Sequence, residues 1–301
     1  MASTIKAFSF TYENSGPKIG VEIDAQPYDF SLAWEIYKQL KNQGKGPRLD
    51  FLQLMVEADF FHSDTFEEVL AALKEIRPLD DLKIKKSYRF NPPIGRPQKI
   101  LCMGRNYRAH AQELGNPVPE EPIFFSKSPS ALLANNETIR LPKDVGSVDF
   151  EGEFALVMGK HAANVSKTKA FDLIAGFSIL NDVTARELQK KDTKEGKPWF
   201  RAKSFDTFCP FGPYLIPKDA FSDYHQLQLQ VRLNGEIKQQ AGLSEMVFDL
   251  AEIVAYFSKH CTLEPGDVIS TGTPSGVGPL HSGDSVECEI TQIGTLKNAV
   301  E

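Results

Sequence analysis

The sequence is poor in three features that mark common functional classes: long apolar runs, excess basic charge and paired cysteines. No stretch of about eighteen consecutive apolar residues occurs in the 301 residues, which argues against a membrane partner. The 34 basic and 40 acidic residues give a net charge of −6, which argues against nucleic acid as a partner. The first ten residues, MASTIKAFSF, lack a basic stretch followed by a long apolar core. We therefore expect no signal peptide and a cytoplasmic protein.

Cysteine and glycine usage exclude two further kinds of site. The four cysteines are scattered and form no C-x-x-C pair, so the sequence predicts neither a zinc site nor a disulfide framework. Reduced thiols in a cytosol are the simpler interpretation. The glycine-rich segment STGTPSGVG, at 270–278, lacks the G-K-[ST] ending of a phosphate-binding loop, which excludes a nucleotide site of that kind.

The sequence pattern changes near residue 77. Residues 1–76 read as a small N-terminal α+β domain, and the proline-rich, charged stretch 77–98 reads as a linker. Residues 99–301 hold many short apolar segments typical of strands and one long amphipathic helix at 243–260. This composition predicts an α+β fold whose larger domain has a barrel-like or sandwich core.

Local patterns in the N-terminal domain predict how its helices pack and begin. We expect two strands and three helices there, at 6–12, 18–23, 31–40, 51–58 and 65–76. In the first helix, Leu32, Ile36 and Leu40 form one apolar stripe. Thr65 and Glu68 have the spacing of a capping box, which predicts that the third helix begins there.

Two glutamates separated by one glycine, in VDFEGEF at 148–154, raise the first question about function. Side chains two apart in a strand share a face, so Glu151 and Glu153 would lie side by side. Their like charges repel, and burial increases the cost, unless a hard cation such as Mg²⁺ or Mn²⁺ compensates them. The commoner explanation is an acidic face in water. Glu287 and Glu289 have the same spacing in DSVECEI, so the pattern needs independent support.

The segment GRNYRAHAQEL, at 104–114, places an imidazole near a carboxylate. If the segment is helical, His110 and Glu113 lie on one face and can touch. A carboxylate orients an imidazole and raises its basicity, which suits a general base. A surface pair three residues apart is the alternative.

Two further segments concentrate polar groups among apolar ones. Asp182, in NDVTARELQ, follows an apolar strand and is either a third oxygen ligand or the N-cap of the next helix. Lys203 lies in the aromatic segment KPWFRAKSFDTFCPFGP. Its ammonium either is paired or faces a ligand, or else it extends into solvent as a surface lysine; the sequence leaves both explanations open.

Taken together, these segments resemble the fumarylacetoacetate hydrolase superfamily. Five motifs occur in the order of that family over about residues 99–298: GRNYRAHAQEL, DFEGEFALVMGK, NDVTARELQ, KPWFRAKSFDTFCPFGP and TGTPSGVG. The short spacing after Pro279 resembles the branch of acylpyruvate hydrolases and oxaloacetate decarboxylases. The resemblance implies a β-rich barrel or roll core, and the N-terminal unit resembles the small extra domain of longer members.

The resemblance also implies a Mg²⁺ or Mn²⁺ site and a set of functional residues. The family's carboxylate triad matches Glu151, Glu153 and Asp182, which would hold the metal. Its catalytic residues match His110, Glu113 and Lys203, of which the first two lie on a segment that closes as a lid over substrate. Weaker matches, which we expect to contact a substrate carboxylate, are Arg105, Arg186, Gln189 and Thr273.

The implied activity is hydrolysis of a carbon–carbon bond in an acylpyruvate-type 2,4-dioxo acid, through a pyruvate enolate, as in aromatic catabolism. Oxaloacetate decarboxylation, isomerisation of a 2-oxo or 2-hydroxy-dienoate acid and sugar-acid dehydration are close alternatives, because they need related chemistry. A non-catalytic metal-binding scaffold is a remoter one. The expected partner is a small anionic 2-oxo acid, and the expected assembly is a homodimer.

Overall fold

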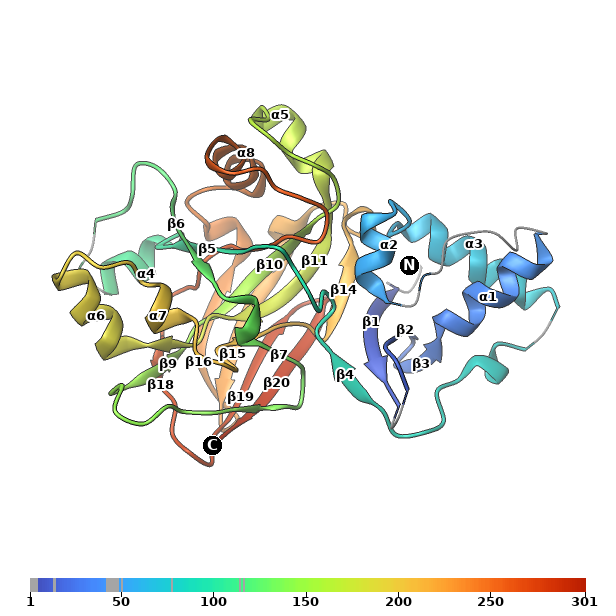
Figure 1. The fold of residues 1–301 in the computed structure, drawn as a ribbon, viewed down its shortest axis with the longest axis horizontal. Coiled ribbons are helices and arrows are strands. Elements are labelled where there is room, and N and C mark those ends of the chain that lie inside the picture. The colour runs from blue at the N-terminus through green and yellow to red at the C-terminus, as the bar shows by residue number, and fades with distance from the viewer. Residues whose placement is uncertain are drawn as a thin grey trace.

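A ten-stranded mixed sheet forms the centre of the fold (Figure 1). The computed structural model describes residues 5–12, 15–41, 49, 51–76, 78–113, 115 and 117–301. The strands of this sheet are β1 Lys6–Thr11, β2 Lys18–Ile23, β3 Gln26–Asp29, β4 Arg89–Asn91, β5 Ile100–Gly104, β6 Ile123–Lys127, β10 Gly152–Met158, β11 Ile174–Asn181, β14 Tyr214–Pro217 and β17 Val268–Ser270. They follow the order β3-β2-β1-β14-β11-β10-β17-β5-β6, and β4 pairs with β1.

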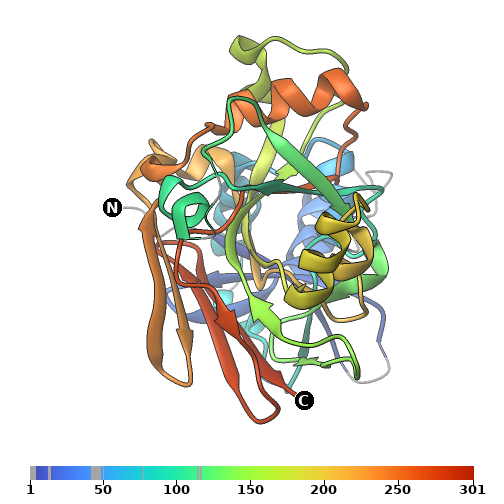
Figure 2. The same cartoon turned by 90° about the vertical axis from the view of Figure 1, so that its left-hand side faces the viewer.

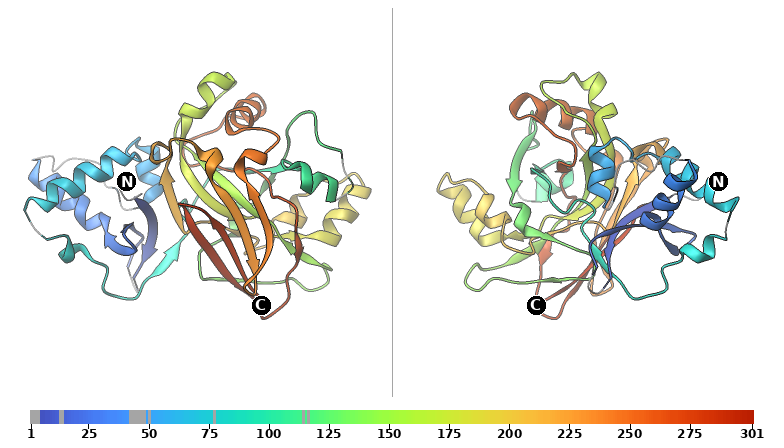
Figure 3. Two further views of the ribbon diagram at one scale, coloured as in Figure 1. Left: turned by 180° about the vertical axis from the view of Figure 1, so that it is seen from behind. Right: turned by 45° about the vertical axis from the view of Figure 1, so that its right-hand side comes forward.

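A second, five-stranded sheet packs against the central one, and Figure 3 shows its long hairpins from behind. It has the order β16-β15-β19-β20-β8. The bounds are β8 Thr138–Ile139, β15 Gln228–Leu233, β16 Glu236–Gly242, β19 Ser285–Ile290 and β20 Gly294–Val300. Two small sheets complete the described strands: β7 Leu132–Leu133 with β13 Cys209–Pro210, and β12 Thr184–Ala185 with β9 Val148–Phe150 and β18 Gly278–Pro279. The predicted β-rich α+β fold is confirmed, but both large sheets have free edges, so the described strands form no closed barrel.

The helices lie outside these sheets, and those of the N-terminal unit pack on a sheet face (Figures 1 and 2). Their bounds are α1 Phe30–Leu40, α2 Leu52–Glu57, α3 Ser63–Lys74, α4 Arg108–Glu113, α5 Lys167–Ala170, α6 Arg186–Lys194, α7 Phe200–Lys203 and α8 Leu250–His260. The helices α6 and α7 lie together beside β6 and the β9–β12 pair, whereas α5 packs on α8. Among the described residues, none of the helices combines the length and the apolar character that crossing a bilayer requires.

The N-terminal unit joins the rest of the molecule through its first strand. Strand β1 pairs with β2 on one side and with β14 on the other, so one sheet continues from the unit into the central strands. A single buried apolar cluster contains Ile19 and Phe66 of the unit together with Val157 and Leu215. The boundaries at 76 and 99 stay a prediction. Residues 1–4, residue 77 and Leu114, on which parts of the predictions fall, lie outside the described residues.

Three local predictions are wrong in detail. In α1 the exposed side chains include Leu32 and Leu40, and the buried face instead contains Trp34. Helix α3 begins at Ser63, with His62 as its N-cap, so Thr65 lies inside the helix and forms no cap. The long helix expected at 243–260 begins only at Leu250. There Asp249 and Glu252 form a capping box, which satisfies backbone N–H groups at the helix start.

Strand β10 is buried on both faces, which is why its sequence reads as a continuous apolar run. Its side chains alternate between two cores. Phe154, Leu156 and Met158 belong to one cluster. Ala155 and Val157 belong to the other, as the period of a strand requires. The strand that carries Glu153 is therefore fixed from both sides.

Candidate functional site

Three carboxylates converge where β10 meets β11. The strands are antiparallel with Gly152 opposite Asn181, which places Glu151 and Asp182 at the same end of the sheet. The backbone N–H of Asp182 donates to the carbonyl oxygen of Glu151 at 2.8 Å. One carboxylate oxygen from each of Glu151, Glu153 and Asp182 lies within 4.8 Å of the others, and all three residues are buried. The predicted convergence of the triad is present in the structure.

The second pair of glutamates shows what the same spacing looks like on a solvated face. Glu287 and Glu289 lie on β19 with their side chains 28% and 39% exposed. Lys297 pairs with Glu287, and Arg232 pairs with Glu289. Glu151 and Glu153, by contrast, are 4% and 1% exposed. The acidic-face explanation therefore holds for the pair on β19 and fails for the pair at β10.

Cationic side chains hold two of the three buried acids. The Lys127 ammonium lies 2.6 Å from Asp182 Oδ1, and the Lys203 ammonium lies 2.5 Å from Asp182 Oδ2. Lys203 also lies 2.8 Å from Glu151 Oε2, and Arg186 forms an ion pair with the other oxygen of Glu151. Although burial opposes ionisation, Lys203 and Arg186 lower the pKa of Glu151. These contacts also reject the N-cap explanation for Asp182, because the residue at the N-cap of α6 is Ala185.

Glu153 differs from the other two acids because no cationic side chain pairs with it in the part of the chain that the structure describes. Its Oε2 accepts a hydrogen bond from the Ser270 hydroxyl at 2.5 Å and another from the Gly272 N–H at 2.9 Å. Burial, together with the charges of Asp182 and Glu151, raises the pKa of Glu153 well above its ordinary value. The site as a whole is therefore short of positive charge next to Glu153.

The donor set fits a hard divalent cation. It consists of carboxylate oxygens alone, which is the chemistry that Mg²⁺ and Mn²⁺ prefer over nitrogen and sulfur ligands. The buried carboxylate of Glu153, without a cationic partner, is the feature that such an ion would compensate. Glu151, Glu153 and Asp182 are thus the residues that could hold it.

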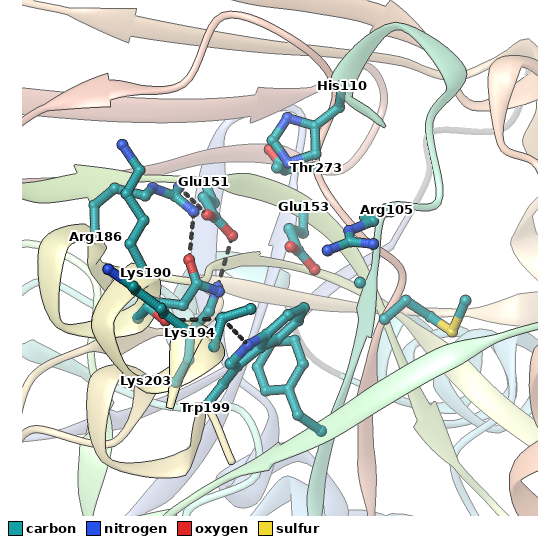
Figure 4. A pocket seen from close by; sticks show the side chains of 15 residues that line it. Arg105, His110, Glu151, Glu153, Arg186, Lys190, Lys194, Trp199, Lys203 and Thr273 are labelled. Atoms are coloured by element: carbon teal, nitrogen blue, oxygen red, sulfur yellow. Dashed lines mark hydrogen bonds and ion pairs between the residues drawn. The ribbon is translucent and has the colours of Figure 1, made fainter. Parts of the chain in front are cut away.

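A cavity of about 330 Å³ opens above these acids (Figure 4). Its walls carry both apolar and basic side chains. The lining residues are Met103, Gly104, Arg105, His110, Phe125, Glu151, Glu153, Arg186, Gln189, Lys190, Thr193, Lys194, Trp199, Lys203 and Thr273. Most of the predicted site residues therefore face one space, while Asp182 and Glu113 lie just behind it.

The predicted dyad forms in α4. His110 Nδ1 lies 3.3 Å from Glu113 Oε2, and Glu113 Oε1 accepts a hydrogen bond from the Gly276 N–H at 2.9 Å. This second contact ties α4 to the glycine-rich segment after β17. Burial lowers the pKa of His110 below its ordinary value, so the imidazole stays neutral near pH 7 and can accept a proton.

All four residues predicted to contact substrate line the cavity, but they differ in whether they already bond other residues of the protein. Arg105 has no hydrogen bond or ion pair to the described residues, and its guanidinium carbon lies 6.0 Å from the centre of the Trp199 ring. Arg186 is already bonded to Glu151 and, through Nε at 2.7 Å, to Asp149. Gln189 accepts from Arg186 at 2.7 Å. Thr273 donates to the Gly152 carbonyl at 2.8 Å. Arg105 is therefore the one of the four with a free charged head group.

Sequence reasoning missed several residues of the site. Lys127 is the last residue of strand β6. The only hint of its role in the sequence is a charged residue at the end of a short strand. Gln239 is buried on β16 and bonds Gly152 N, Thr273 Oγ1 and Pro274 O, with distances of 3.0, 2.8 and 2.7 Å. No sequence signal separates it from its exposed neighbour Gln240. Lys190 and Lys194 lie four and eight residues after Arg186 on α6, so the helical spacing in the sequence could have predicted that they share its face and line the cavity.

Comparisons with known proteins agree with the geometry. A family profile described as fumarylacetoacetate (FAA) hydrolase C-terminal matches residues 99–301. A mitochondrial oxaloacetate tautomerase of Xenopus laevis is 44% identical over 215 residues, which cover 69% of this chain and 67% of that protein. The crystal structure of 2-hydroxyhepta-2,4-diene-1,7-dioate isomerase from Mycobacterium marinum is 41% identical, with a TM-score of 0.63 over 74% of this chain and 79% of that one.

Several solved structures also match the N-terminal unit, among them the following one. The fumarylacetoacetate hydrolase of Exiguobacterium antarcticum is 31% identical, with a TM-score of 0.79 over 99% of both chains. The five motifs quoted from the sequence lie inside the region that the family profile matches. The chain belongs to the fumarylacetoacetate hydrolase family.

Proposed function

We propose that the protein is a divalent-metal-dependent enzyme that acts on a 2-oxo acid through its enolate. The observation that carries this proposal is the cluster of Glu151, Glu153 and Asp182 beneath a cavity that also holds His110. Mg²⁺ or Mn²⁺ at these carboxylates would supply a Lewis acid that polarises a 2-oxo group and favours negative charge on its oxygen. Catalysis by such charge stabilisation contributes more than most single effects.

The residues of the chain itself have separable roles in this reaction. When His110 donates its Nδ1–H to Glu113, Nε2 is left as the basic nitrogen that accepts a proton. Lys203 is fully buried, and although burial opposes its charge, Asp182 and Glu151 raise its pKa. Its ammonium therefore stays positive, orients the two carboxylates and adds positive charge beneath the enolate oxygen.

Keto–enol tautomerisation is the first candidate reaction. Here His110 moves one proton between C3 and the enol oxygen of the substrate, and no bond between carbon atoms breaks. Relatives named oxaloacetate tautomerase, from frog, cattle and human, support this choice at 42–44% identity. The isomerase from Mycobacterium marinum supports it as well.

Hydrolysis of an acylpyruvate is the second candidate, and the His110–Glu113 pair favours it. A base next to the cavity can take a proton from water, which then attacks the 4-oxo carbon of the substrate. The bond between C3 and C4 breaks, and its electron pair stays on C3 as the pyruvate enolate, which a proton converts to pyruvate. Both reactions thus use one enolate and one set of residues.

A substrate panel tests the proposal. Enol oxaloacetate, acetylpyruvate and keto oxaloacetate would be assayed with Mg²⁺, with Mn²⁺ and with EDTA, so that tautomerisation, hydrolysis and decarboxylation are read separately. We expect turnover of at least one acid, loss of it in EDTA, and a loss of about two orders of magnitude or more for Glu151→Ala. The matched control is Glu287→Ala, which removes a half-exposed acid. Absence of metal-dependent turnover across the panel would contradict the proposal.

A further inference from the structure

The glycine between Glu151 and Glu153 is a flexible link in the acid cluster. A Cβ at Gly152 would come within 2.3 Å of Val231 Cγ2 on the second sheet, so the position requires glycine. Glycine also has more backbone freedom than any other residue. A rotation at Gly152 would turn the two glutamate side chains away from each other and from Asp182. The backbone on either side of this glycine must therefore be fixed by other contacts if the three carboxylates are to converge.

Groups from other elements hold the peptide groups on both sides of Gly152. In the first peptide group, the Glu151 carbonyl oxygen accepts from the Asp182 N–H at 2.8 Å. The N–H of the same group, on Gly152, donates to Gln239 Oε1 at 3.0 Å. In the next group, the Gly152 carbonyl oxygen accepts from the Thr273 hydroxyl at 2.8 Å. Gln239 and Thr273 are 1% and 2% exposed, so bulk water does not compete for these bonds.

The hydrogen-bonding chemistry allows the Gln239 amide one orientation. The Gly152 N–H can only donate, so the side-chain oxygen of Gln239 must face it. The Pro274 carbonyl oxygen can only accept, so the amide nitrogen must face that side, where Nε2 lies 2.7 Å from it. Nε2 also donates to the Thr273 hydroxyl at 2.8 Å, and that hydroxyl donates its own proton to the Gly152 carbonyl. Gln239, Thr273 and Gly152 thus form a closed ring of hydrogen bonds, which we call the Gln239 clasp.

Strand β16, which carries Gln239, also supports the glycine-rich segment after β17. A Cβ at Gly276 would lie 2.0 Å from the Lys238 carbonyl oxygen, so this segment packs directly on the strand. The Gly276 N–H donates to Glu113 Oε1 at 2.9 Å. One strand of the second sheet therefore contacts both the backbone between the two glutamates and the segment to which Glu113 is bonded. Because β16 is itself paired with β15, the clasp has a fixed base.

We propose that Gln239 is a positioning residue of the metal site, which fixes, through Thr273 and Gly152, the directions in which Glu151 and Glu153 present their carboxylates. The inference rests on the proposed function, because a divalent ion is what these acids would hold. Gln239 is not among the described residues that line the cavity, so it acts through the backbone and touches no substrate. Ligands that are ordered in advance bind an ion more tightly, because less conformational entropy is lost on binding.

The binding of Mn²⁺ without substrate tests this role. Its dissociation constant would be measured by calorimetry, at a temperature at which circular dichroism shows each variant folded. We expect Gln239→Leu and Thr273→Val each to raise this constant at least about tenfold. The double variant should lose no more than the weaker-binding single variant, because both changes open the same clasp. Two matched controls should keep the wild-type constant: Thr273→Ser, which retains the hydroxyl, and Gln240→Leu, at the exposed neighbouring position.

The outcomes separate the clasp from the function on which it rests. A wild-type constant in either single variant, losses that multiply in the double variant, or an equal loss in Thr273→Ser overturns the positioning role and leaves the metal-dependent function standing. If the wild-type protein binds no Mn²⁺, both proposals are overturned. If Gln239→Leu does not fold, the comparison of Thr273→Val with Thr273→Ser decides the question, because the first removes the hydroxyl that closes the clasp and the second keeps it.

Discussion

Replacing Glu153 by glutamine separates the two roles of this residue, because the same change should stabilise the protein without metal and abolish its response to metal. The side chain is 1% exposed, and it accepts two hydrogen bonds that a glutamine oxygen can also accept. Glutamine removes a carboxylate that has no cationic partner among the described residues and lies beside Asp182 and Glu151. We expect the metal-free variant to gain about 1 kcal/mol of unfolding free energy, or about 2 °C in melting temperature.

The metal response should change in the opposite direction. For wild-type protein at a free Mn²⁺ concentration of about 100 times its dissociation constant, linkage gives about 2.7 kcal/mol of stabilisation. Glu153→Gln should lose most of it, because an amide oxygen is a weaker ligand than a carboxylate. Thermal unfolding with Mn²⁺ and with EDTA measures both effects. The control is Glu289→Gln, on a half-exposed pair with Arg232, which should change little in either condition. A variant less stable than wild type in EDTA, or stabilised equally by Mn²⁺, would refute the reasoning.

Two further predictions concern the groups around the acids. Gln239→Leu leaves the Gly152 N–H and the Pro274 carbonyl without their buried partner. Thermal or urea unfolding should therefore show a loss of about 2–4 kcal/mol in unfolding free energy. The control Gln240→Leu, at an exposed position, should change this free energy little. Because burial lowers the pKa of His110 below 6.5, its neutral form persists to lower pH, so the midpoint of the acid limb of kcat/KM should lie below pH 6.5. His110→Gln should lower kcat/KM at every pH, because the group that transfers the proton is gone, and an acid limb centred at or above pH 6.5 in the wild type would contradict the assignment.

Much of the site could be predicted because its chemistry is concentrated in short segments. Glu151 and Glu153 are only two residues apart in the chain, and Asp182 follows the strand that pairs with β10. Lys127 could not be predicted in the same way, since it lies 55 residues before Asp182 and meets it only because the fold brings the end of β6 next to the end of β11. Pairing between distant segments is set by the fold and leaves no local pattern.

The errors in the fold have a similar origin. In α1 two stripes have helical spacing, one containing Leu32 and Leu40 and the other containing Phe30 and Trp34. Only the second meets the core, because the face that is buried depends on where the helix lies against the sheet. The late start of α8 was readable in principle, since the Asp249–Glu252 capping box is a local signal that outweighs the apolar residues before it.

The pairing of β1 with β14 has a consequence for anyone who shortens this protein. Ala7 lies opposite Leu215 and Phe8 opposite Tyr214, whose hydroxyl donates to Glu22 at 2.6 Å. A fragment beginning at residue 99 would leave β14 as a bare strand edge, with apolar surface beside it that Ile19 and Phe66 now cover. Exposed strand edges of this kind pair with other chains, so we expect the fragment to aggregate where the full chain does not.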